Sequence, residues 1–336
     1  MIWYKKHCED DIIVSTRVRL ARNLADYPFP NVLGADAAKK AKQEIFDAVD
    51  KEKSFFGDSM RRLEMADMSA PERRALVEKH LISAELADKN VGCALINSED
   101  ELSIMLMEED HIRIQVITGG FAIHQAYDAA QSADDALERH LNYAFSEKFG
   151  YLTACPTNTG TGLRASVMMH LPALEMTGNI GRVIESASRL GLTVRGLYGE
   201  GSKAYGSLYQ LSNQVTLGFS EEEILAKVEN IANQIKKHEQ DARASIEHDD
   251  RAADRFWRSF GTLKYARSLS SGEAKSLLSD YITARALGII DEKIKVEPVE
   301  LMVLTEPAHI QQMASGAELT PEQRDKKRAE LIRSSI

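Results

Sequence analysis

A cysteine, a polar loop and an arginine lie within ten residues of one another in the stretch CPTNTGTGLRASVMMH, which begins at Cys155. A thiol becomes reactive when neighbouring groups stabilise its thiolate, and an arginine holds a phosphate through paired hydrogen bonds. A loop rich in hydroxyl and backbone groups could bind a ligand between them. The same residues could also form an ordinary turn, so other parts of the chain must decide which chemistry applies.

Arginines recur on the polar faces of several expected strands, at positions Arg17, Arg19, Arg113, Arg164 and Arg195. Two arginines at i and i+2 lie on one face of a strand, roughly 6–7 Å apart. Each alone could be a solvated strand residue, but the group favours a clamp for a polyphosphate, which phosphoryl transfer requires. The stretch GTGLRAS lacks the lysine of a P-loop, and the chain has no H-R-D or D-F-G set of an ordinary protein kinase.

Carboxylates form the third chemical group. Glu108, Glu109 and Asp110 follow one another at the end of an expected strand, close to Arg113, and Glu200 lies in a loop after an arginine-bearing strand. An acidic turn is the simpler interpretation of the three neighbours. The functional interpretation is that one of these carboxylates handles a cationic substrate.

Composition limits the class of protein. The chain has 336 residues, a formal net charge of −9, 43% hydrophobic and 28% charged residues, which is ordinary for a soluble globular protein. An acidic chain is a poor general binder of nucleic acid or membrane surfaces. Cys8, Cys93 and Cys155 are too scattered for a zinc site or a disulfide framework, and no signal peptide or membrane span is visible. We therefore expect a cytoplasmic protein with free thiols, no direct nucleic acid partner and no membrane partner.

Hydrophobic periodicity indicates an α+β chain. Period-two alternation predicts strands at 12–20, 91–96, 101–107, 111–117, 164–171, 192–199 and 205–218, with the second to fourth of these antiparallel. Helical spacing predicts helices over most of 35–90, over 119–150 with Leu137, Leu141 and Phe145 as its apolar stripe and Gly150 as its cap, and over 177–190, from Ser220 onward, 251–290 and 318–336. A boundary near 240–250 divides a mixed domain, 1–245, from an all-helical domain, 246–336.

Five motifs, taken in order, resemble the phosphagen kinases, the ATP:guanidino phosphotransferases. The family's Cys-Pro-Ser/Thr-Asn-x-Gly-Thr pattern matches 155–161, its S-x-R-x-R strand matches 15–19, its N-E-E-D-H segment matches 107–111, its R-A-S-V strand matches 164–167, and its R-G-x-x-G-E loop matches 195–200. The asparagine of the third motif is Met107 here. The resemblance implies an antiparallel sheet flanked by helices, the glutamine-synthetase-like catalytic fold.

The resemblance also implies roles for residues. Glu109 is the expected base, Glu200 the second carboxylate that orients the guanidinium, and Cys155 the thiol beside it, with Thr157 stabilising the thiolate. The implied ATP-binding residues are Ser15, Thr16, Arg17, Val18, Arg19, His80, Arg113, Arg164, Ala165, Ser166, Val167, Met168, Arg195, Gly196, Leu197, Tyr198, Gly199 and Glu200. The implied cofactors are ATP and Mg²⁺, with no dedicated protein site for the metal, which ATP mainly holds.

The position of the domains indicates a branch of the family. Small-molecule members carry a helical domain before the S-x-R-x-R strand, whereas only 14 residues precede Ser15 here and a helical extension follows the catalytic part. This layout, and the segment TRVRLARNLADYPFP, resemble the bacterial protein-arginine kinases. That branch implies protein substrates phosphorylated on arginine, with the Clp protease system and a heat-shock repressor as partners. The helical extension favours a homodimer. A kinase of free arginine and a non-catalytic adaptor that keeps the fold are the alternatives.

A last motif lies in the C-terminal helix. Arg324 and Arg328 are four residues apart, so they share a helix face, and Asp325 lies beside them. A solvated helix face is the simple interpretation. The string RDKKRA resembles the phosphoarginine-binding motif of protein-arginine kinases, which implies an allosteric phosphoarginine pocket formed by these three residues.

Overall fold

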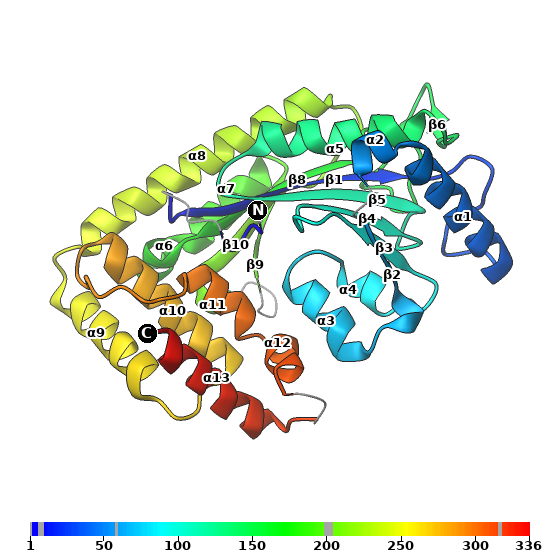
Figure 1. Cartoon of the computed structure of the whole chain (residues 1–336). Coiled ribbons are helices and arrows are strands. Elements are labelled where there is room, and N and C mark those ends of the chain that lie inside the picture. Colours follow the sequence, from blue (N-terminus) through cyan, green and yellow to red (C-terminus); the bar gives the residue numbers. More distant parts are fainter. Residues whose placement is uncertain (1, 6–9, 58–59, 198–203, 315–317) are drawn as a thin grey trace. The chain divides into compact units, whose positions relative to one another are not determined.

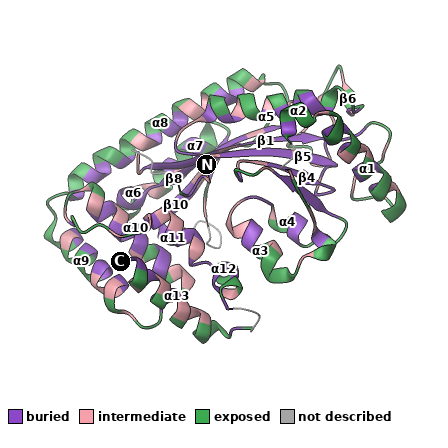
Figure 2. Ribbon diagram, viewed as in Figure 1, coloured by how far each residue is buried: buried purple, intermediate pink, exposed green. Residues whose placement is uncertain are grey.

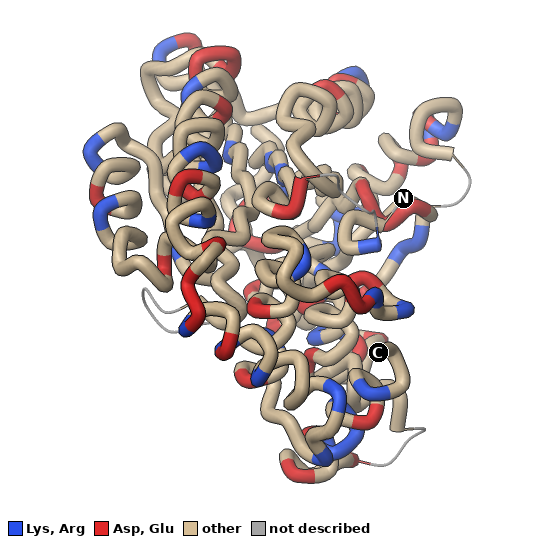
Figure 3. The backbone as a smooth tube through the Cα atoms, turned by 90° about the vertical axis from the view of Figure 1, so that its left-hand side faces the viewer, with Lys and Arg blue, Asp and Glu red and all other residues tan. Residues whose placement is uncertain are grey.

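The computed structural model describes residues 2–5, 10–57, 60–197, 204–314 and 318–336. The chain divides into two compact units. The first contains Met1–Trp3, Thr16–Ser166 and Ser212–Glu229, and the second contains Tyr4–Ser15, Val167–Leu211 and Asn230–Ile336. None of the described helices combines the length and the hydrophobicity that a membrane-spanning segment requires. Figure 3 shows acidic and basic residues mixed along the backbone, so the net charge of −9 arises from both signs rather than from one acidic tract.

Eight strands of the described chain form a sheet in the order β2-β3-β4-β5-β1-β8-β10-β9 (Figure 1). Their bounds are β1 Ile13–Arg22, β2 Arg61–Glu64, β3 Cys93–Ile96, β4 Leu102–Leu106, β5 Ile112–Gly119, β8 Leu163–His170, β9 Leu192–Gly196 and β10 Leu208–Asn213. The strands β2 to β5 pair antiparallel with their sequence neighbours, with Ile96 opposite Ser103 and Met105 opposite Arg113. The predicted antiparallel order of the three strands between 91 and 117 is confirmed.

Helices complete the α+β class that the sequence predicts. They are α1 Ala35–Lys51, α2 Lys53–Phe56, α3 Ala70–Glu78, α4 Ala84–Ala87, α5 Ile123–Glu138, α6 Pro172–Met176, α7 Ile180–Arg189, α8 Glu221–Ile246, α9 Asp250–Tyr265, α10 Ser271–Ala286, α11 Pro298–Leu304, α12 Pro307–Gln312 and α13 Pro321–Ser335, with short 3₁₀ turns η1 Met65–Asp67 and η2 Tyr205–Ser207. Ser220 accepts a hydrogen bond from the backbone N–H of Glu223 at 3.1 Å, so it caps α8 as predicted.

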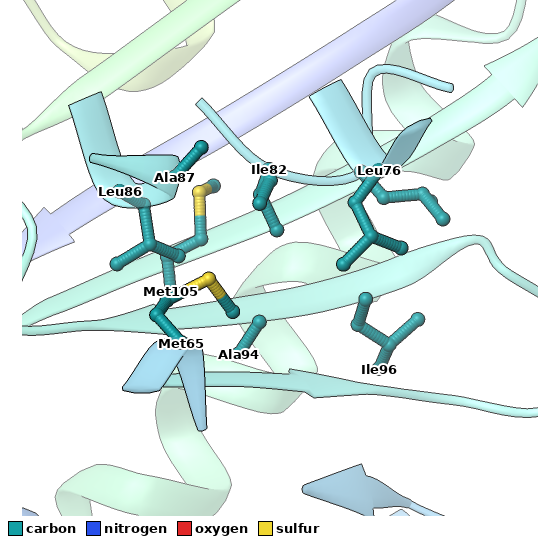
Figure 4. Packing of buried hydrophobic residues seen from close by; sticks show 9 residues of the cluster. Met65, Leu76, Ile82, Leu86, Ala87, Ala94, Ile96 and Met105 are labelled. Carbon is teal, nitrogen blue, oxygen red and sulfur yellow. The ribbon is translucent and has the colours of Figure 1, made fainter. Parts of the chain in front are cut away.

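The core of the first unit lies between two of its helices and its strands. Met65, Leu76, Ile82, Leu86 and Met105 belong to a buried cluster that packs α3 and α4 against β3 and β4 (Figure 4). The strands β3, β4 and β5 of this unit are buried over most of their length, as Figure 2 shows. A hairpin held this way presents the loop between β4 and β5 from a fixed base.

The second unit has its own core. Phe260 of α9 stacks on Tyr281 of α10 with ring centroids 5.5 Å apart. Asp280 is buried, and it accepts hydrogen bonds from Arg255 at 2.8 and 3.0 Å and from Ser259 at 2.7 Å. In the same unit His170 lies 2.7 Å from the hydroxyl of Ser279, which joins the end of β8 to α10. The predicted helical region after residue 246 is confirmed.

The long helix predicted over 119–150 is wrong after Glu138. The chain leaves α5, because Ala144 donates its backbone N–H to Asn23 at 2.7 Å and Asn142 accepts from Ala25 at 2.8 Å. Residues 145–151 then form a small hairpin, with strands β6 Phe145–Ser146 and β7 Gly150–Tyr151. Phe145 is 60% exposed rather than part of an apolar stripe. Pairing with the segment after β1 outweighs the helical propensity of this stretch.

Gly150 is therefore not a helix cap. Its φ is +73°, and a Cβ there would lie 2.4 Å from the carbonyl oxygen of Gly160. Glycine is required because the two backbones pair closely, with the N–H of Tyr151 donating to Gly160 at 2.8 Å.

Other expectations were only partly right. The predicted helix over 35–90 is interrupted by β2, whose sequence RRLE has no apolar alternation and whose Glu64 pairs with Lys42 at 2.6 Å. The predicted half-buried strand at 12–20 is buried on nearly all positions, and only Arg17 and Arg19 are partly exposed. The predicted helix over 177–190 and the predicted strand over 205–218 are shorter, at α7 and β10.

Candidate active site

The loop between β4 and β5 carries the carboxylates. Glu108 is fully buried, accepts a hydrogen bond from Ser83 and pairs with Arg113. Glu109 keeps 33% of its side chain exposed, and its carboxylate lies 3.1 Å from the same arginine. Burial raises the pKa of Glu109, Arg113 opposes that effect, and the negative charges of Asp110 and Glu108 add to it. Of the two glutamates, Glu109 is the one that can reach a ligand and take a proton.

The backbone explains an unusual residue at the start of this loop. Met107 has a φ of +59° and is 1% exposed, and its N–H donates to the carbonyl of His111 at 3.0 Å. Asparagine adopts this left-handed conformation more readily than most residues. The family asparagine at this position can therefore serve the turn geometry. Met107 makes the same turn while its side chain fills a buried space.

Asp110 joins the carboxylate loop to the cysteine loop. It is buried and accepts hydrogen bonds from the side chain of Asn23 at 2.6 Å and from the backbone N–H of Ala154 at 2.7 Å. Asn23 in turn accepts from the backbone of His111 at 2.9 Å. Because Ala154 precedes Cys155 directly, this buried bridge fixes the spacing between Glu109 and the thiol.

The cysteine loop is held from several sides. The Sγ atom of Cys155 lies 3.0 Å from the hydroxyl oxygen of Thr157. Thr216 donates to the carbonyl of Thr159 at 2.6 Å, and the guanidinium of Arg22 donates to the carbonyl of Thr161 at 3.0 Å. The contact between the thiol and the threonine hydroxyl, expected from the family motif, is present.

Arginines from three strands meet beside this loop. The charges of Arg17, Arg113 and Arg164 each lower the pKa of Arg19, after burial, which is the largest cause. The Nε atom of Arg19 is buried and has no hydrogen-bond partner among the described residues. Three neighbouring positive charges that disfavour a fourth, together with an unused donor, are the signature of a site built for an anion.

One cavity brings these groups together. It has a volume of about 90 Å³, and its lining is Arg19, Ala21, Glu109, Arg113, Cys155, Thr157, Asn158, Gly162 and Arg164. This space contains the carboxylate, the thiol and three arginines. The first and last of these residues, Arg19 and Arg164, are more than 130 positions apart in the sequence. A cationic group could contact the carboxylate and the thiol of this lining and lose a proton there. A phosphate beside that cationic group could contact the arginines of the same lining.

Other residues implied in ATP binding lie on the same strands but serve the fold directly. Thr16 is buried and donates to the carbonyl of Gly120 at 2.7 Å. Ser166 donates to the carbonyl of Arg17 at 3.1 Å, and the N–H of Ala165 donates to Asn213 at 2.9 Å. Ser15, Val18, Val167 and Met168 are buried strand residues. They place the arginines, and they do not line the cavity.

The remaining predicted residues are not all gathered there. His80 follows α3 in a turn with a φ of +59°, contacts the ring of Trp3 at 5.4 Å between centroids, and does not line the cavity. Arg195 is exposed on β9, Gly196 ends that strand, and Leu197 donates its N–H to Leu208 at 2.8 Å. Tyr198, Gly199 and Glu200, and with them the second predicted carboxylate, lie outside the described residues.

In α13 the three residues of the predicted regulatory motif have different environments. Arg328 is 1% exposed and donates to the carbonyls of Thr305 at 2.6 Å and Leu269 at 2.7 Å, and it pairs with Asp325. Arg324 is partly exposed and donates to the carbonyl of Leu319 at 2.7 Å. Arg328 therefore ties three segments of the second unit together, a structural role that sequence spacing did not indicate.

Sequence reasoning missed the residues that hold the site in place. Arg22 and Asp134 form a buried pair at 2.6 Å, and Arg22 also lies 3.5 Å from the centre of the Tyr151 ring. Asn23 and Asp110 bridge the loops. The string TRVRLARN contains Arg22 and Asn23 next to the predicted strand, but no spacing links them to partners that are 112 and 87 residues away.

Replacing Cys155 with serine is expected to lower the rate of the reaction carried out in this cavity by roughly ten- to hundredfold without unfolding the protein, because a hydroxyl is far less acidic and less polarisable than a thiol. Steady-state kinetics and a thermal melt measure the two effects. Burial raises the pKa of Cys93 to about 12, so a thiol alkylator should modify Cys155 before that residue. The serine variant is the control, since its residual activity should resist the alkylator. Full activity of the wild type after alkylation of Cys155 would exclude a catalytic thiol.

Comparisons with known proteins give two family matches that together cover most of the chain. The family model described as the ATP:guanido phosphotransferase C-terminal catalytic domain matches residues 40–242, and that described as the protein-arginine kinase McsB C-terminal domain matches residues 249–336. A protein-arginine kinase of Brevibacillus brevis is 46% identical over 338 residues, covering 99% of this chain and 94% of the relative. One of Pelotomaculum thermopropionicum is 49% identical over 333 residues, covering 97% and 92%.

Solved structures show the same fold at lower identity. A lombricine kinase superposes with a TM-score of 0.61 at 23% identity, over 72% of this chain and 70% of that one. A duplicated taurocyamine kinase of Schistosoma mansoni gives a TM-score of 0.58 at 26% identity, over 70% and 35%.

Proposed function

The chain belongs to the ATP:guanido phosphotransferase family, in its protein-arginine kinase branch, and on that basis we propose how its residues divide the reaction. The enzyme is an ATP-dependent phosphotransferase that phosphorylates arginine side chains of proteins. The observation that carries the division of roles is the cavity in which Glu109, Cys155 and three arginines meet.

Glu109 is the base in this proposal. A guanidinium is protonated at any physiological pH and must lose a proton before its nitrogen can attack phosphorus. Glu109 is exposed enough to pair with the substrate, and its raised pKa makes it a stronger base than an ordinary carboxylate. Arg113 and the bridge through Asp110 hold it in place.

In this proposal Cys155 contacts the guanidinium of the substrate, and the arginines contact the phosphates of ATP. The thiolate would face the positive guanidinium, supported by the hydroxyl of Thr157. Arg19 and Arg164 would hold the phosphates of ATP, which bring their own Mg²⁺ and supply the transferred phosphoryl group. The arginine cluster fits such an anion, because Arg19 has an unused buried donor and is surrounded by like charge. Glu200 remains the proposed second carboxylate, on the strength of the family motif.

The larger organisation extends the proposal. Residues 1–245 would form the catalytic domain and 246–336 a regulatory domain, which the two separate family matches support. Arg324, Asp325 and Arg328 would form an allosteric phosphoarginine site in the second. For Arg328 this requires that its present contacts with Thr305 and Leu269 be compatible with a ligand or exchanged for it. The Clp protease system and a heat-shock repressor are proposed as partners from the family resemblance alone. A homodimer is proposed from the helical extension, and a cytoplasmic location from the free thiols and the lack of a signal peptide in the sequence.

The test of the function compares two acceptors. Enzyme with labelled ATP and Mg²⁺ is offered either an unfolded protein or free arginine at the same arginine concentration. Transfer to the protein supports the proposal, and transfer confined to free arginine would contradict it.

A further inference from the structure

The peptide group between Glu108 and Glu109 is held at both of its polar atoms. Its carbonyl oxygen, which belongs to Glu108, accepts a hydrogen bond from the ammonium group of Lys89. Its N–H, which belongs to Glu109, donates to the carboxylate of Glu108 at 2.6 Å. A peptide group is planar, so bonds at both ends fix the orientation of the plane. That orientation sets the direction in which the side chain of Glu109 leaves the backbone.

The carboxylate of Glu108 is itself held from outside its loop. One of its oxygens accepts the hydroxyl hydrogen of Ser83 at 2.5 Å and also pairs with Arg113. The other oxygen accepts the N–H of Glu109. Because Glu108 is fully buried, its charge depends on these donors in place of water. Ser83 therefore fixes the acceptor of the peptide N–H, whereas Lys89 fixes the peptide carbonyl.

Both holding residues flank the short helix α4. Ser83 caps this helix by accepting the backbone N–H of Leu86 at 3.0 Å, and Lys89 follows its last residue, Ala87, by two positions. Leu86 and Ala87 are buried in the cluster that packs α4 against the strands (Figure 4). The two polar contacts therefore reach the carboxylate loop from a helix whose own place is fixed by apolar packing.

The turn between β4 and β5 is closed without these contacts. The strands pair along their length, and the N–H of Met107 donates to the carbonyl of His111 at 3.0 Å. Lys89 keeps 31% of its side chain exposed and lies 2.9 Å from the carboxylate of Glu85, which is a sufficient partner for a surface lysine. Its further bond to the carbonyl of Glu108 restricts the side chain, and what that bond adds is order next to Glu109.

We propose that Ser83 and Lys89 are positioning residues for phosphoryl transfer, which hold the peptide group before Glu109 and so aim its carboxylate at the substrate guanidinium. This inference rests on the role of Glu109 proposed above. Neither Ser83 nor Lys89 lines the cavity, so both act through the carboxylate loop. A base that is displaced by about 1 Å transfers a proton much more slowly, by up to roughly a hundredfold.

Steady-state kinetics of single variants test the proposal. Ser83→Ala removes the hydroxyl, and Lys89→Met removes the ammonium group but keeps the stem. With an unfolded protein and MgATP as substrates, each should lower kcat by about tenfold. The Kd for MgATP, measured by calorimetry, should change by less than about twofold, because the proposed phosphate contacts Arg19 and Arg164 are untouched. Ser83→Thr keeps the hydroxyl and should retain at least about half of the wild-type kcat.

The double variant Ser83→Ala, Lys89→Met separates positioning from two unrelated weakenings. Both residues hold the same peptide group, so the loss of either bond already releases it. The double variant should therefore be slower than the slower single variant by no more than about twofold, whereas independent effects would multiply to about a hundredfold.

Two matched controls remove the same chemical groups elsewhere in the first unit. Ser69 caps α3 as Ser83 caps α4, but its hydroxyl contacts Glu72 and not the carboxylate loop. Lys40 is an exposed lysine of α1. Ser69→Ala and Lys40→Met should each keep kcat within about twofold of the wild type.

Three results would overturn the positioning role: wild-type kcat in both single variants, a Ser83→Thr enzyme as slow as Ser83→Ala, or a multiplied loss in the double variant. If Ser83→Ala does not fold, Lys89→Met decides alone, since its side chain is partly exposed. A wild-type kcat in that variant would then contradict the proposal.

Glu109→Gln is measured in the same assay, so that the two proposals can fail separately. An active Glu109→Gln enzyme would contradict the role of Glu109 on which the inference rests. An inactive Glu109→Gln enzyme beside fully active Ser83→Ala and Lys89→Met enzymes would contradict the positioning role alone.

Discussion

Replacing Glu109 with glutamine is expected to lower kcat by about 10²- to 10⁴-fold, the usual contribution of a general base, while the Kd for ATP changes by less than about twofold. The amide keeps the shape of the side chain but cannot take a proton from the substrate guanidinium. Single-turnover kinetics with a protein substrate give the rate, and calorimetry with MgATP gives the affinity.

The control for this variant is Glu222→Gln, an exposed glutamate of α8 that lies outside the cavity. It should retain the wild-type rate. A Glu109→Gln enzyme with more than about a tenth of the wild-type rate, a loss below about 1.4 kcal/mol, would show that another group takes the proton. The raised pKa of Glu109 adds a second check, because kcat/KM of the wild type should fall with decreasing pH at values above the ordinary range of a glutamate.

Replacing Arg19 with methionine should have two effects of opposite sign. The Kd for MgATP should rise by roughly 10- to 100-fold, because one charge-assisted contact with phosphate is lost. The ligand-free protein should become more stable by about 1 kcal/mol. Burial and the positive charges of three other arginines disfavour the charge of Arg19, whereas methionine is uncharged and keeps an apolar side chain of similar length. Calorimetry and denaturant unfolding measure the two quantities.

Arg267→Gln serves as the comparison, since Arg267 is exposed in the loop after α9 and lies outside the cavity. Both its affinity and its stability should stay near the wild-type values. If Arg19→Met binds MgATP normally, Arg19 does not hold the nucleotide. If the variant loses affinity and is also less stable, the site is not strained by its own charge.

The predictable part of the fold is the part governed by local pattern. Alternation placed β1 and β8, and the short connections between 91 and 117 indicated antiparallel pairing, as found. β2 escaped notice because its sequence RRLE has no apolar period, and its pairing with β3 comes from the sheet edge. The end of α5 at Glu138 depends on backbone bonds to Asn23 and Ala25, more than 110 residues earlier, which no local propensity encodes.

The candidate site divides in the same way. Glu109, Cys155, Arg19, Arg113 and Arg164 were expected from family motifs, and the structure places all five on one cavity. The residues that hold these side chains in place were not expected. A buried ion pair such as that of Arg22 with Asp134 leaves no recognisable pattern in the sequence around either residue. The left-handed turn at Met107 is a further case. The backbone conformation explains why an asparagine suits that position, whereas the sequence showed only that it was missing.

This chain phosphorylates arginine side chains of proteins, and we propose that Glu109 is the base of the reaction. The most direct measurement is mass spectrometry of an unfolded protein after incubation with the enzyme and MgATP, under mild conditions because phosphoarginine is labile to acid. Phosphate is expected on arginine residues with the wild type, and none above background with Glu109→Gln. Phosphate on serine, threonine or tyrosine, no modified arginine with the wild type, or equal modification by both enzymes would contradict it.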